Sequence, residues 1–135
     1  MITEKLFLEA KELLSQLIAQ VSFSKEESGT SQIIQDFFQK KQIPFHCFLN
    51  NVWAINKYFD PSKPSVLLNS HHDTVKPNVS WTFDPFTPTE VENKLFGLGS
   101  NDAGASLVCL IITFCELYDA KDLPFNLVIA ATAEE

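Results

Sequence analysis

Two adjacent carboxylates, Glu134 and Glu135, end the chain directly after an apolar run of strand length, residues 127–133. Buried carboxylates that lie side by side repel each other, and each loses its hydration, so a metal ion or a shared proton is needed to stabilise them. A solvated pair at the surface is the alternative, and this motif alone leaves both interpretations open. Two further motifs favour the metal ion.

The first of these is His71-His72-Asp73, which follows an apolar segment at residues 65–70. In an extended chain alternate side chains share a face, so His71 and Asp73 point the same way and His72 points away. A carboxylate beside a histidine ligand holds its second ring nitrogen and raises its basicity. We therefore expect His71 to bind a metal and Asp73 to orient it. A lone histidine hydrogen-bonded within a core is the alternative.

The second motif is the glycine-rich turn Gly97-Leu98-Gly99-Ser100-Asn101-Asp102, which leads into an apolar stretch of helical length. The dinucleotide-binding fingerprint has a third glycine where Asp102 stands, and a carboxylate there would repel a pyrophosphate. A dinucleotide-binding domain is therefore a distant alternative. A serine hydrolase is disfavoured because Ser100 lacks the Gly-x-Ser-x-Gly elbow. A carboxylate at such a turn is instead well placed to reach a cation, since glycines allow close backbone approach.

Length, composition and charge restrict the class of protein. The chain has 135 residues, enough for one domain with a core, and 45% of them are hydrophobic and 20% charged. Ten basic against seventeen acidic residues give a net charge of −7, which argues against a nucleic-acid partner. No apolar stretch is long enough to span a bilayer and no signal pattern opens the chain, so we expect no membrane partner.

The three cysteines indicate a reducing compartment. Cys47, Cys109 and Cys115 form no Cys-x-x-Cys pair and are odd in number. Cys109 and Cys115 lie within the apolar helical run, so we expect them to be reduced core thiols. The cytoplasm is the expected compartment.

Hydrophobic periodicity predicts the elements that position the three motifs. Two amphipathic helices are expected, over residues 3–21 with Thr3 as the N-cap and over residues 31–41, with a polar loop at 24–30 between them.

Strands and a third helix are predicted for the rest of the chain. The strands are expected at residues 45–49, 52–58, 65–70 and from about 125, with a hairpin turn at Asn50-Asn51 and a long helix over about 102–118. The strand at 65–70 is apolar enough to be buried on both faces. A strand, a long helix and a strand in succession favour a crossover with a parallel pair, and hence an α/β fold. We expect the three motifs to meet at the carboxyl edge of this sheet.

In order and spacing, these motifs resemble the zinc aminoacylase and deacetylase family that includes acetylornithine deacetylase and succinyl-diaminopimelate desuccinylase. The matching stretches are Ser70-His71-His72-Asp73-Thr74-Val75, Phe96-Gly97-Leu98-Gly99-Ser100-Asn101-Asp102 and Thr132-Ala133-Glu134-Glu135. By this resemblance His71 binds one metal ion, Asp102 bridges two, and Glu135 binds the other. Asp73 supports His71, and Glu134 acts as the general base. The resemblance also implies two zinc ions, with cobalt or manganese as alternatives, and a cis peptide bond between Asp102 and Ala103.

The resemblance implies a fold and an activity as well. The fold is a three-layer α/β sandwich with a mostly parallel sheet, of which residues 1–135 form the N-terminal part of the catalytic domain. A further carboxylate, a histidine ligand and a lid domain come from a later part, and a homodimer would form through that absent domain. The implied function is hydrolysis of the amide bond of a small N-acyl amino acid in amino-acid biosynthesis, most similar to acetylornithine deacetylase.

Two features leave alternatives open. Leu98 and the segment Ala103-Gly104-Ala105 depart from the residues common in the family, so the substrate subgroup is not determined. The chain also lacks the remaining ligands, so we expect the 135-residue chain alone to be inactive. The alternative from another class is a truncated, non-catalytic fragment that binds metal or a partner.

Overall fold

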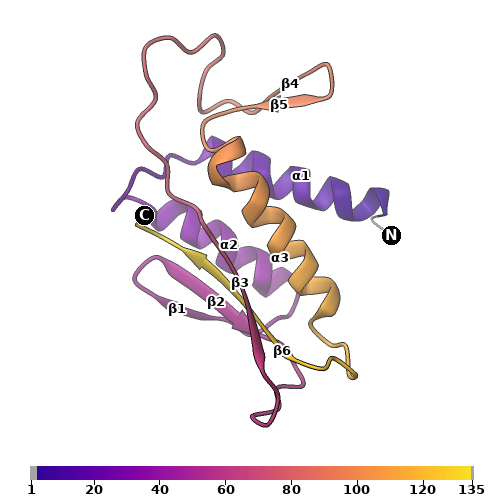
Figure 1. Cartoon of the computed structure of the whole chain (residues 1–135). Helices are drawn as coiled ribbons and strands as arrows, with labels where there is room; N and C mark the ends of the chain where they lie inside the picture. The colour runs from indigo at the N-terminus through magenta and orange to yellow at the C-terminus, as the bar shows by residue number, and fades with distance from the viewer. Residues whose placement is uncertain (1–2, 135) are drawn as a thin grey trace.

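The computed structural model describes residues 3–134. Its elements, in chain order, are α1 (Glu4–Ala19), α2 (Ser28–Lys40), β1 (His46–Phe48), β2 (Asn51–Ile55), β3 (Ser65–His71), β4 (Thr89–Val91), β5 (Lys94–Phe96), the wide helical turn η1 (Ser100–Gly104), α3 (Ala105–Leu117) and β6 (Asn126–Thr132) (Figure 1).

Both predicted amphipathic helices are present, but α1 ends at Ala19, two residues before its predicted end, and the bounds of α2 differ at both ends. The hydroxyl of Thr3 accepts a hydrogen bond from the backbone N–H of Leu6 at 3.3 Å, so the predicted N-cap of α1 is confirmed. Helix α2 begins at Ser28, three residues before the predicted start, and includes Gly29. Burial of Thr30 in its first turn stabilises this start, because packing outweighs the weak helix propensity of glycine.

The main sheet has the strand order β1-β2-β6-β3. Strands β3 and β6 pair in parallel across the α3 crossover, as predicted, whereas β1–β2 and β2–β6 are antiparallel. The predicted parallel character is therefore confined to β3 and β6, because β1 and β2 form a hairpin beside them. Phe48 pairs with Asn51, so the turn of this hairpin is Leu49-Asn50, with Leu49 at φ 52°, and not Asn50-Asn51.

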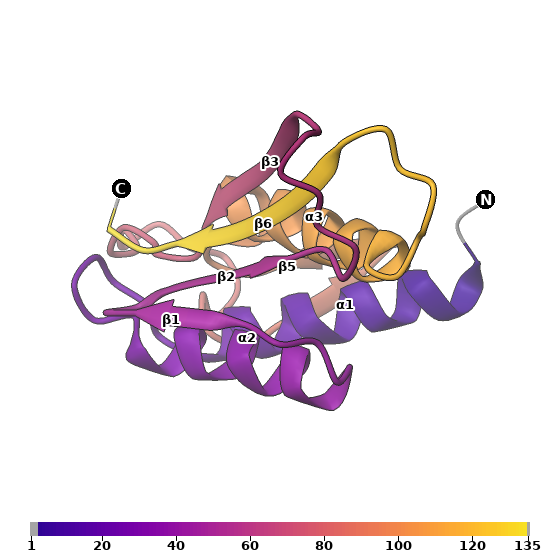
Figure 2. The same cartoon turned by 90° about the horizontal axis from the view of Figure 1, so that it is seen from below.

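All three helices lie on one side of this sheet (Figure 2). Alternate residues of β6, including Ile129 and Ala131, are buried in a single core with Val52 and Ala54 of β2 and residues of every helix. Phe38 of α2 is fully buried there. The α/β class is confirmed, and the described residues supply the sheet and one helix layer of the predicted sandwich.

Strand β3 is more exposed than the sequence suggests. Leu67 is 60% exposed and Val66 is 40% exposed, so the expectation of a strand buried on both faces is wrong. The reason is its position, because β3 is the edge strand of the sheet. Within residues 3–134, no helix covers the face that lies opposite α3.

Helix α3 corrects one expectation about the cysteines. Cys109 is exposed, so it is not a core thiol, whereas Cys115 is half-buried and burial raises the pKa of its thiol to about 12. By length and composition alone the segment Ser100–Leu117, with mean hydropathy 1.3, could cross a membrane. Its buried face, which includes Leu107 and Ile111, instead forms part of the core.

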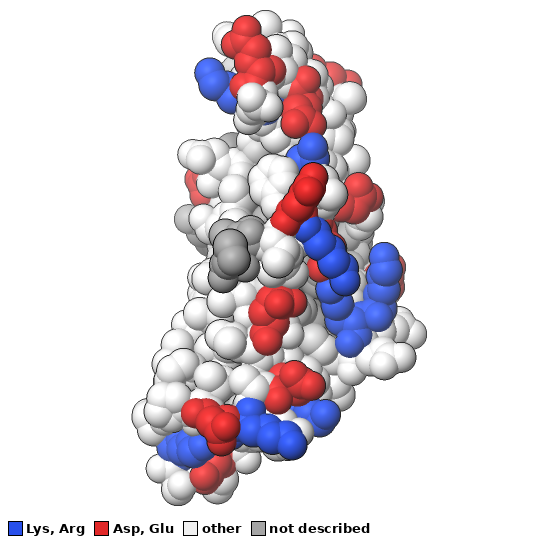
Figure 3. Space-filling view, turned by 90° about the vertical axis from the view of Figure 1, so that its right-hand side faces the viewer, with Lys and Arg blue, Asp and Glu red and all other residues white. Residues whose placement is uncertain are grey.

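Acidic and basic side chains are interspersed on the face of the molecule seen in Figure 3. Two ion pairs connect elements at the surface. Lys11 of α1 lies 2.8 Å from Glu90 of β4, and Lys41, which follows α2, lies 2.6 Å from Glu9 of α1. Pairs of this kind contribute about 0–1 kcal/mol each, so packing of the core accounts for more of the stability.

Candidate metal centre

The candidate site lies where β3 and β6 end side by side. His71, the last residue of β3, pairs with Thr132, the last residue of β6, so the carboxyl ends of both strands meet at one edge of the sheet. Open α/β sheets place their ligand sites at this edge. Asp102 of η1 reaches the same edge and contacts His71, which confirms the predicted convergence of these two residues.

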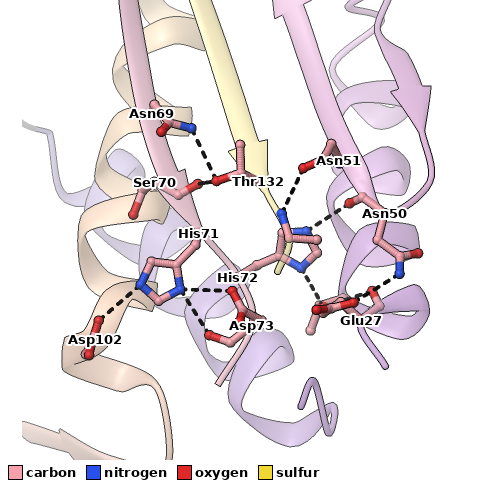
Figure 4. Close-up of polar contacts among 12 residues, drawn as sticks. Glu27, Asn50, Asn51, Asn69, Ser70, His71, His72, Asp73, Asp102 and Thr132 are labelled. Carbon is pink, nitrogen blue, oxygen red and sulfur yellow. Dashed lines mark hydrogen bonds and ion pairs between the residues drawn. The ribbon is translucent and has the colours of Figure 1, made fainter. Parts of the chain in front are cut away.

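The ring of His71 is held between two aspartates (Figure 4). Its Nδ1 atom lies 3.1 Å from the backbone oxygen of Asp73 and 3.2 Å from Asp73 Oδ1, while its Nε2 atom lies 3.1 Å from Asp102 Oδ1. The predicted shared face of His71 and Asp73 is therefore confirmed. Both oxygens of Asp73 are acceptors, so Nδ1 can donate its ring proton to Asp73 in the Nδ1–H tautomer of the imidazole.

In the tautomer with its proton on Nδ1, the lone pair of Nε2 faces the Asp102 carboxylate. Two acceptors 3.1 Å apart repel unless a cation, either a proton or a metal ion, lies between them. An imidazole nitrogen and a carboxylate oxygen are common zinc ligands, and the aspartate behind Nδ1 is the usual support for such a histidine. The chemistry of this donor pair therefore fits a metal ion.

The donor set within residues 3–134 is small. No group of three or more His, Cys, Asp and Glu side chains in this range lies close enough together to hold a metal ion. The side chain of Asp102 is 84% exposed, whereas that of Asp73 is 5% exposed. The buried aspartate thus supports the histidine, and the exposed aspartate is accessible to a ligand.

The glycine-rich turn brings Asp102 close to the end of β3. Gly99 has φ 76°, and a Cβ atom at this position would collide with the methyl group of Thr74, so only glycine fits without strain. The backbone N–H of Gly104 then donates to the carbonyl of Gly99 at 2.8 Å and closes the wide turn η1. The peptide bond between Asp102 and Ala103 is cis, as the family resemblance implied.

His72 points to the other side of the strand, as predicted. Its Nε2 atom lies 3.0 Å from the backbone oxygen of Asn50, and its Nδ1 atom lies 2.7 Å from the hydroxyl of Thr30. The residue is 5% exposed, and burial lowers the pKa of its imidazole below the ordinary value. His72 therefore joins β3 to α2 and to the β1–β2 turn.

Three polar residues near the site were missed in the sequence. Glu27 is fully buried, and its carboxylate accepts hydrogen bonds from the backbone N–H of Lys25 at 2.6 Å and from the Asn50 amide at 3.1 Å. The side-chain oxygen of Asn51 accepts from the backbone N–H of Ala133 at 3.0 Å. The only sequence signal was the polar pair Asn50-Asn51, which indicated a turn, and nothing marked Glu27 as buried.

Of the two terminal glutamates, the structure describes Glu134. Glu134 has φ 62° and is exposed, and its carboxylate lies 3.6 Å from the ammonium group of Lys25. Glu135 lies outside the described residues. The structure thus brings together His71, Asp73 and Asp102, while the metal and base roles of the two glutamates remain predictions.

A cavity of about 400 Å³ opens beside this cluster. His71 and Asp102 line it together with Ser24, Thr74 and Trp81. The hydroxyl of Thr74 is buried, and it has no hydrogen-bond partner among residues 3–134. A larger hollow of about 890 Å³ lies between α1 and α2, away from these residues. The cavity beside His71 is large enough to hold a small substrate next to the cluster.

Comparison with known protein families identifies this arrangement. The sequence model of Peptidase family M20/M25/M40 matches residues 67–135, just over half of the chain. This range contains all three motifs, from His71-His72-Asp73 through the glycine-rich turn to the terminal glutamates.

Curated relatives include desuccinylases. A succinyl-diaminopimelate desuccinylase of Methylibium petroleiphilum is 26% identical over 118 residues, which cover 80% of this chain and 31% of the relative. A probable succinyl-diaminopimelate desuccinylase of Staphylococcus aureus (strain Mu50) is 29% identical over 129 residues, covering 92% of this chain and 32% of the relative. The chain therefore spans about a third of the length of these relatives.

Solved structures share the fold. A metallo-carboxypeptidase of the M20 family from Sulfolobus solfataricus superposes with a TM-score of 0.75 at 19% identity, over 98% of this chain and 31% of that one. The YXEP protein of Bacillus subtilis, a dinuclear metal binding peptidase from the M20 family, gives a TM-score of 0.71 at 14% identity, over 99% of this chain and 37% of that one. The family model, which matches more than half of the chain, shows that the chain belongs to Peptidase family M20/M25/M40.

Proposed function

We propose that this chain is the N-terminal part of the catalytic domain of a metal-dependent amidohydrolase that cleaves the amide bond of an N-acyl amino acid. One observation carries the proposal: His71 Nε2 lies 3.1 Å from Asp102 Oδ1, with Asp73 behind Nδ1. Membership of the M20 family and the desuccinylase relatives support a hydrolytic reaction at an amide bond. The reduced cysteines favour a cytoplasmic enzyme.

The proposed ligands follow from the donors and from the family resemblance. His71 would hold one metal ion, Glu135 would hold the second, and Asp102 would contribute its carboxylate to both. The dinuclear metal site of the related YXEP protein supports a pair of ions. Nitrogen and oxygen donors without cysteine suit zinc, and cobalt or manganese would accept the same donors.

The residues of this chain have separate tasks in the proposed reaction. When bound, two zinc ions would lower the pKa of the attacking water and polarise the amide carbonyl. Glu134 accepts the proton of that water and delivers it to the leaving nitrogen. Asp73 keeps the ring proton of His71 on Nδ1, so that Nε2 stays available as a donor atom.

The substrate subgroup is the finer part of the proposal. The motifs are similar to those of acetylornithine deacetylase, and the curated relatives act on a succinylated diamino acid by name. We therefore propose an N-acyl diamino acid, with N-acetylornithine and N-succinyl-diaminopimelate as the two substrates to compare.

The test uses the complete protein that contains this chain. We expect bound zinc, release of a free amine from at least one of the two substrates, and loss of turnover on removal of metal with a chelator. A protein that retains no divalent metal and hydrolyses neither substrate would contradict the proposal.

The second candidate function is a non-catalytic fragment that binds metal or a partner. The observation that favours it is the small donor set, since residues 3–134 contain no cluster of three ligands. For the isolated 135-residue chain we expect weak zinc binding and no hydrolysis of acyl amino acids. Turnover by this chain that Glu134→Gln abolishes would show instead that it is a complete catalyst.

A further inference from the structure

The end of β6 is held by a side chain where the backbone ladder stops. The last pair between β2 and β6 is Val52 with Ala131, and the last pair between β3 and β6 is His71 with Thr132. One residue further on, the N–H of Ala133 donates to the side-chain oxygen of Asn51 at 3.0 Å. The Asn51 side chain thus continues the β2–β6 ladder by one hydrogen bond.

This hydrogen bond lies directly before the carboxylates proposed for the reaction. Glu134 follows Ala133 and has φ 62°, so the chain changes direction sharply at this residue. A small rotation of the preceding peptide plane would swing Glu134. The direction of the Glu134 side chain therefore depends on how firmly the N–H of Ala133 is fixed.

The turn that directly precedes Asn51 is itself anchored from two sides (Figure 4). The amide of Asn50 donates to the buried carboxylate of Glu27 at 3.1 Å, and the backbone oxygen of Asn50 lies 3.0 Å from Nε2 of His72. Glu27 is 0% exposed and His72 is 5% exposed. Both anchors are thus in the interior, and Asn51 extends from a part of the chain that cannot move freely.

We propose that Asn51 is a positioning residue, which fixes the N–H of Ala133 and thereby directs Glu134 towards the water and Glu135 towards the metal. The inference rests on the proposed function, and it adds a residue that does not line the cavity beside His71. Groups that hold the ligands of a metal site typically change metal affinity or activity by about 10–100-fold when they are removed. We expect an effect near the lower end of this range, about tenfold, because the hydrogen bond acts through the backbone.

The test compares Asn51→Ala, Asn51→Asp and wild type in the complete protein. Asn51→Ala should weaken zinc binding by about tenfold and lower kcat with little change in KM, since it removes the anchor but no substrate contact. Asn51→Asp loses the 3.3 Å hydrogen bond from the Asn51 amide to the Phe48 carbonyl but keeps an oxygen acceptor for Ala133, so it should restore most of both properties. Amide hydrogen exchange at Ala133 should become faster in Asn51→Ala and return towards the wild-type rate in Asn51→Asp.

Asn69→Ala is the matched control. Its side-chain amide also contacts β6, donating to the backbone oxygen of Ala130 at 3.0 Å and to the Thr132 hydroxyl at 3.3 Å, but it leaves the N–H of Ala133 untouched. We expect zinc affinity, kcat and exchange at Ala133 to stay at wild-type values in this variant. If Asn51→Ala does not fold, Asn51→Gln replaces it, since one extra methylene displaces the acceptor and should cause the same loss.

The outcomes separate the two proposals. A wild-type protein without bound metal or turnover overturns the proposed function and the role of Asn51 within it. A wild type that binds zinc and turns over, with an Asn51→Ala variant of equal zinc affinity and kcat, overturns the positioning role alone. Equal losses in Asn51→Ala and Asn69→Ala would also overturn it, because they would show general loosening of β6.

Discussion

His71 and Asp102 are 31 positions apart in the chain, and their Nε2 and Oδ1 atoms lie 3.1 Å apart in the structure. The contact joins the end of β3 to the wide turn η1 that precedes α3. Each atom is an acceptor when the imidazole is neutral with its proton on Nδ1, so in that tautomer a proton or a metal ion between the two atoms is needed to stabilise the contact. This relationship links the fold to the proposed chemistry.

Replacement of His71 tests that relationship directly. In the complete protein, His71→Ala should remove one of two bound zinc ions and abolish turnover, because the change deletes a ligand. Zinc per chain, measured by mass spectrometry, checks the prediction. His46→Ala is the control, since this exposed histidine stacks on Trp53 and lies outside the site. Equal zinc content in both variants would rule out His71 as a ligand.

Replacement by glutamine should have different effects on zinc content and kcat at the two terminal glutamates. Glu134→Gln should keep both zinc ions and lower kcat by about 10²–10⁴-fold, the usual contribution of a general base. Glu135→Gln should instead weaken the binding of one metal ion, because a neutral amide replaces an anionic ligand. Zinc content and kcat of both variants check these roles. Loss of metal in Glu134→Gln together with full occupancy in Glu135→Gln would reverse the assignment.

The buried carboxylate of Glu27 should be important for stability. Glu27→Gln replaces one of its two acceptor oxygens by an N–H₂ group, so either the hydrogen bond from the Lys25 N–H to Oε1 or the one from the Asn50 amide to Oε2 is lost. We expect the free energy of unfolding to fall by about 1–3 kcal/mol. Urea unfolding of the complete protein measures this change. Glu26→Gln, at the exposed neighbouring position, should change it little, and similar values for both variants would contradict the prediction.

The thiol of Cys115 should react slowly with alkylating reagents. Burial raises its pKa to about 12, so at pH 8 the protonated form predominates, and only the thiolate is nucleophilic. The alkylation rate should rise as the pH approaches 12 and more thiolate forms. A time course with iodoacetamide at pH 8, followed by peptide mass spectrometry, should show the exposed Cys47 and Cys109 modified first. Modification of Cys115 at the rate of Cys109 would contradict the burial argument.

The sequence by itself determined the local geometry of the site and the class of fold. A strand repeats every two residues, so the spacing of His71 and Asp73 was enough to predict that they share a face. A helix of about four turns between two apolar strand-like segments was enough to predict the parallel pair of β3 and β6. The glycines before Asp102 indicated a tight turn, because only glycine adopts such a backbone without strain.

Tertiary structure alone decided which distant residues became neighbours and which apolar residues were covered. Leu67 is apolar and lies in an apolar segment, which predicts burial, yet it is exposed because β3 is the edge of the sheet. Glu27 is charged and lies in a polar segment, which predicts an exposed loop residue. It is nevertheless buried, and the Asn50 amide and the N–H of Lys25 donate hydrogen bonds to its carboxylate oxygens. The bond from Asn51 to Ala133 spans 82 positions. Hydrophobic periodicity specifies the faces of a single element, whereas such contacts depend on how separate elements pack, which no local pattern encodes.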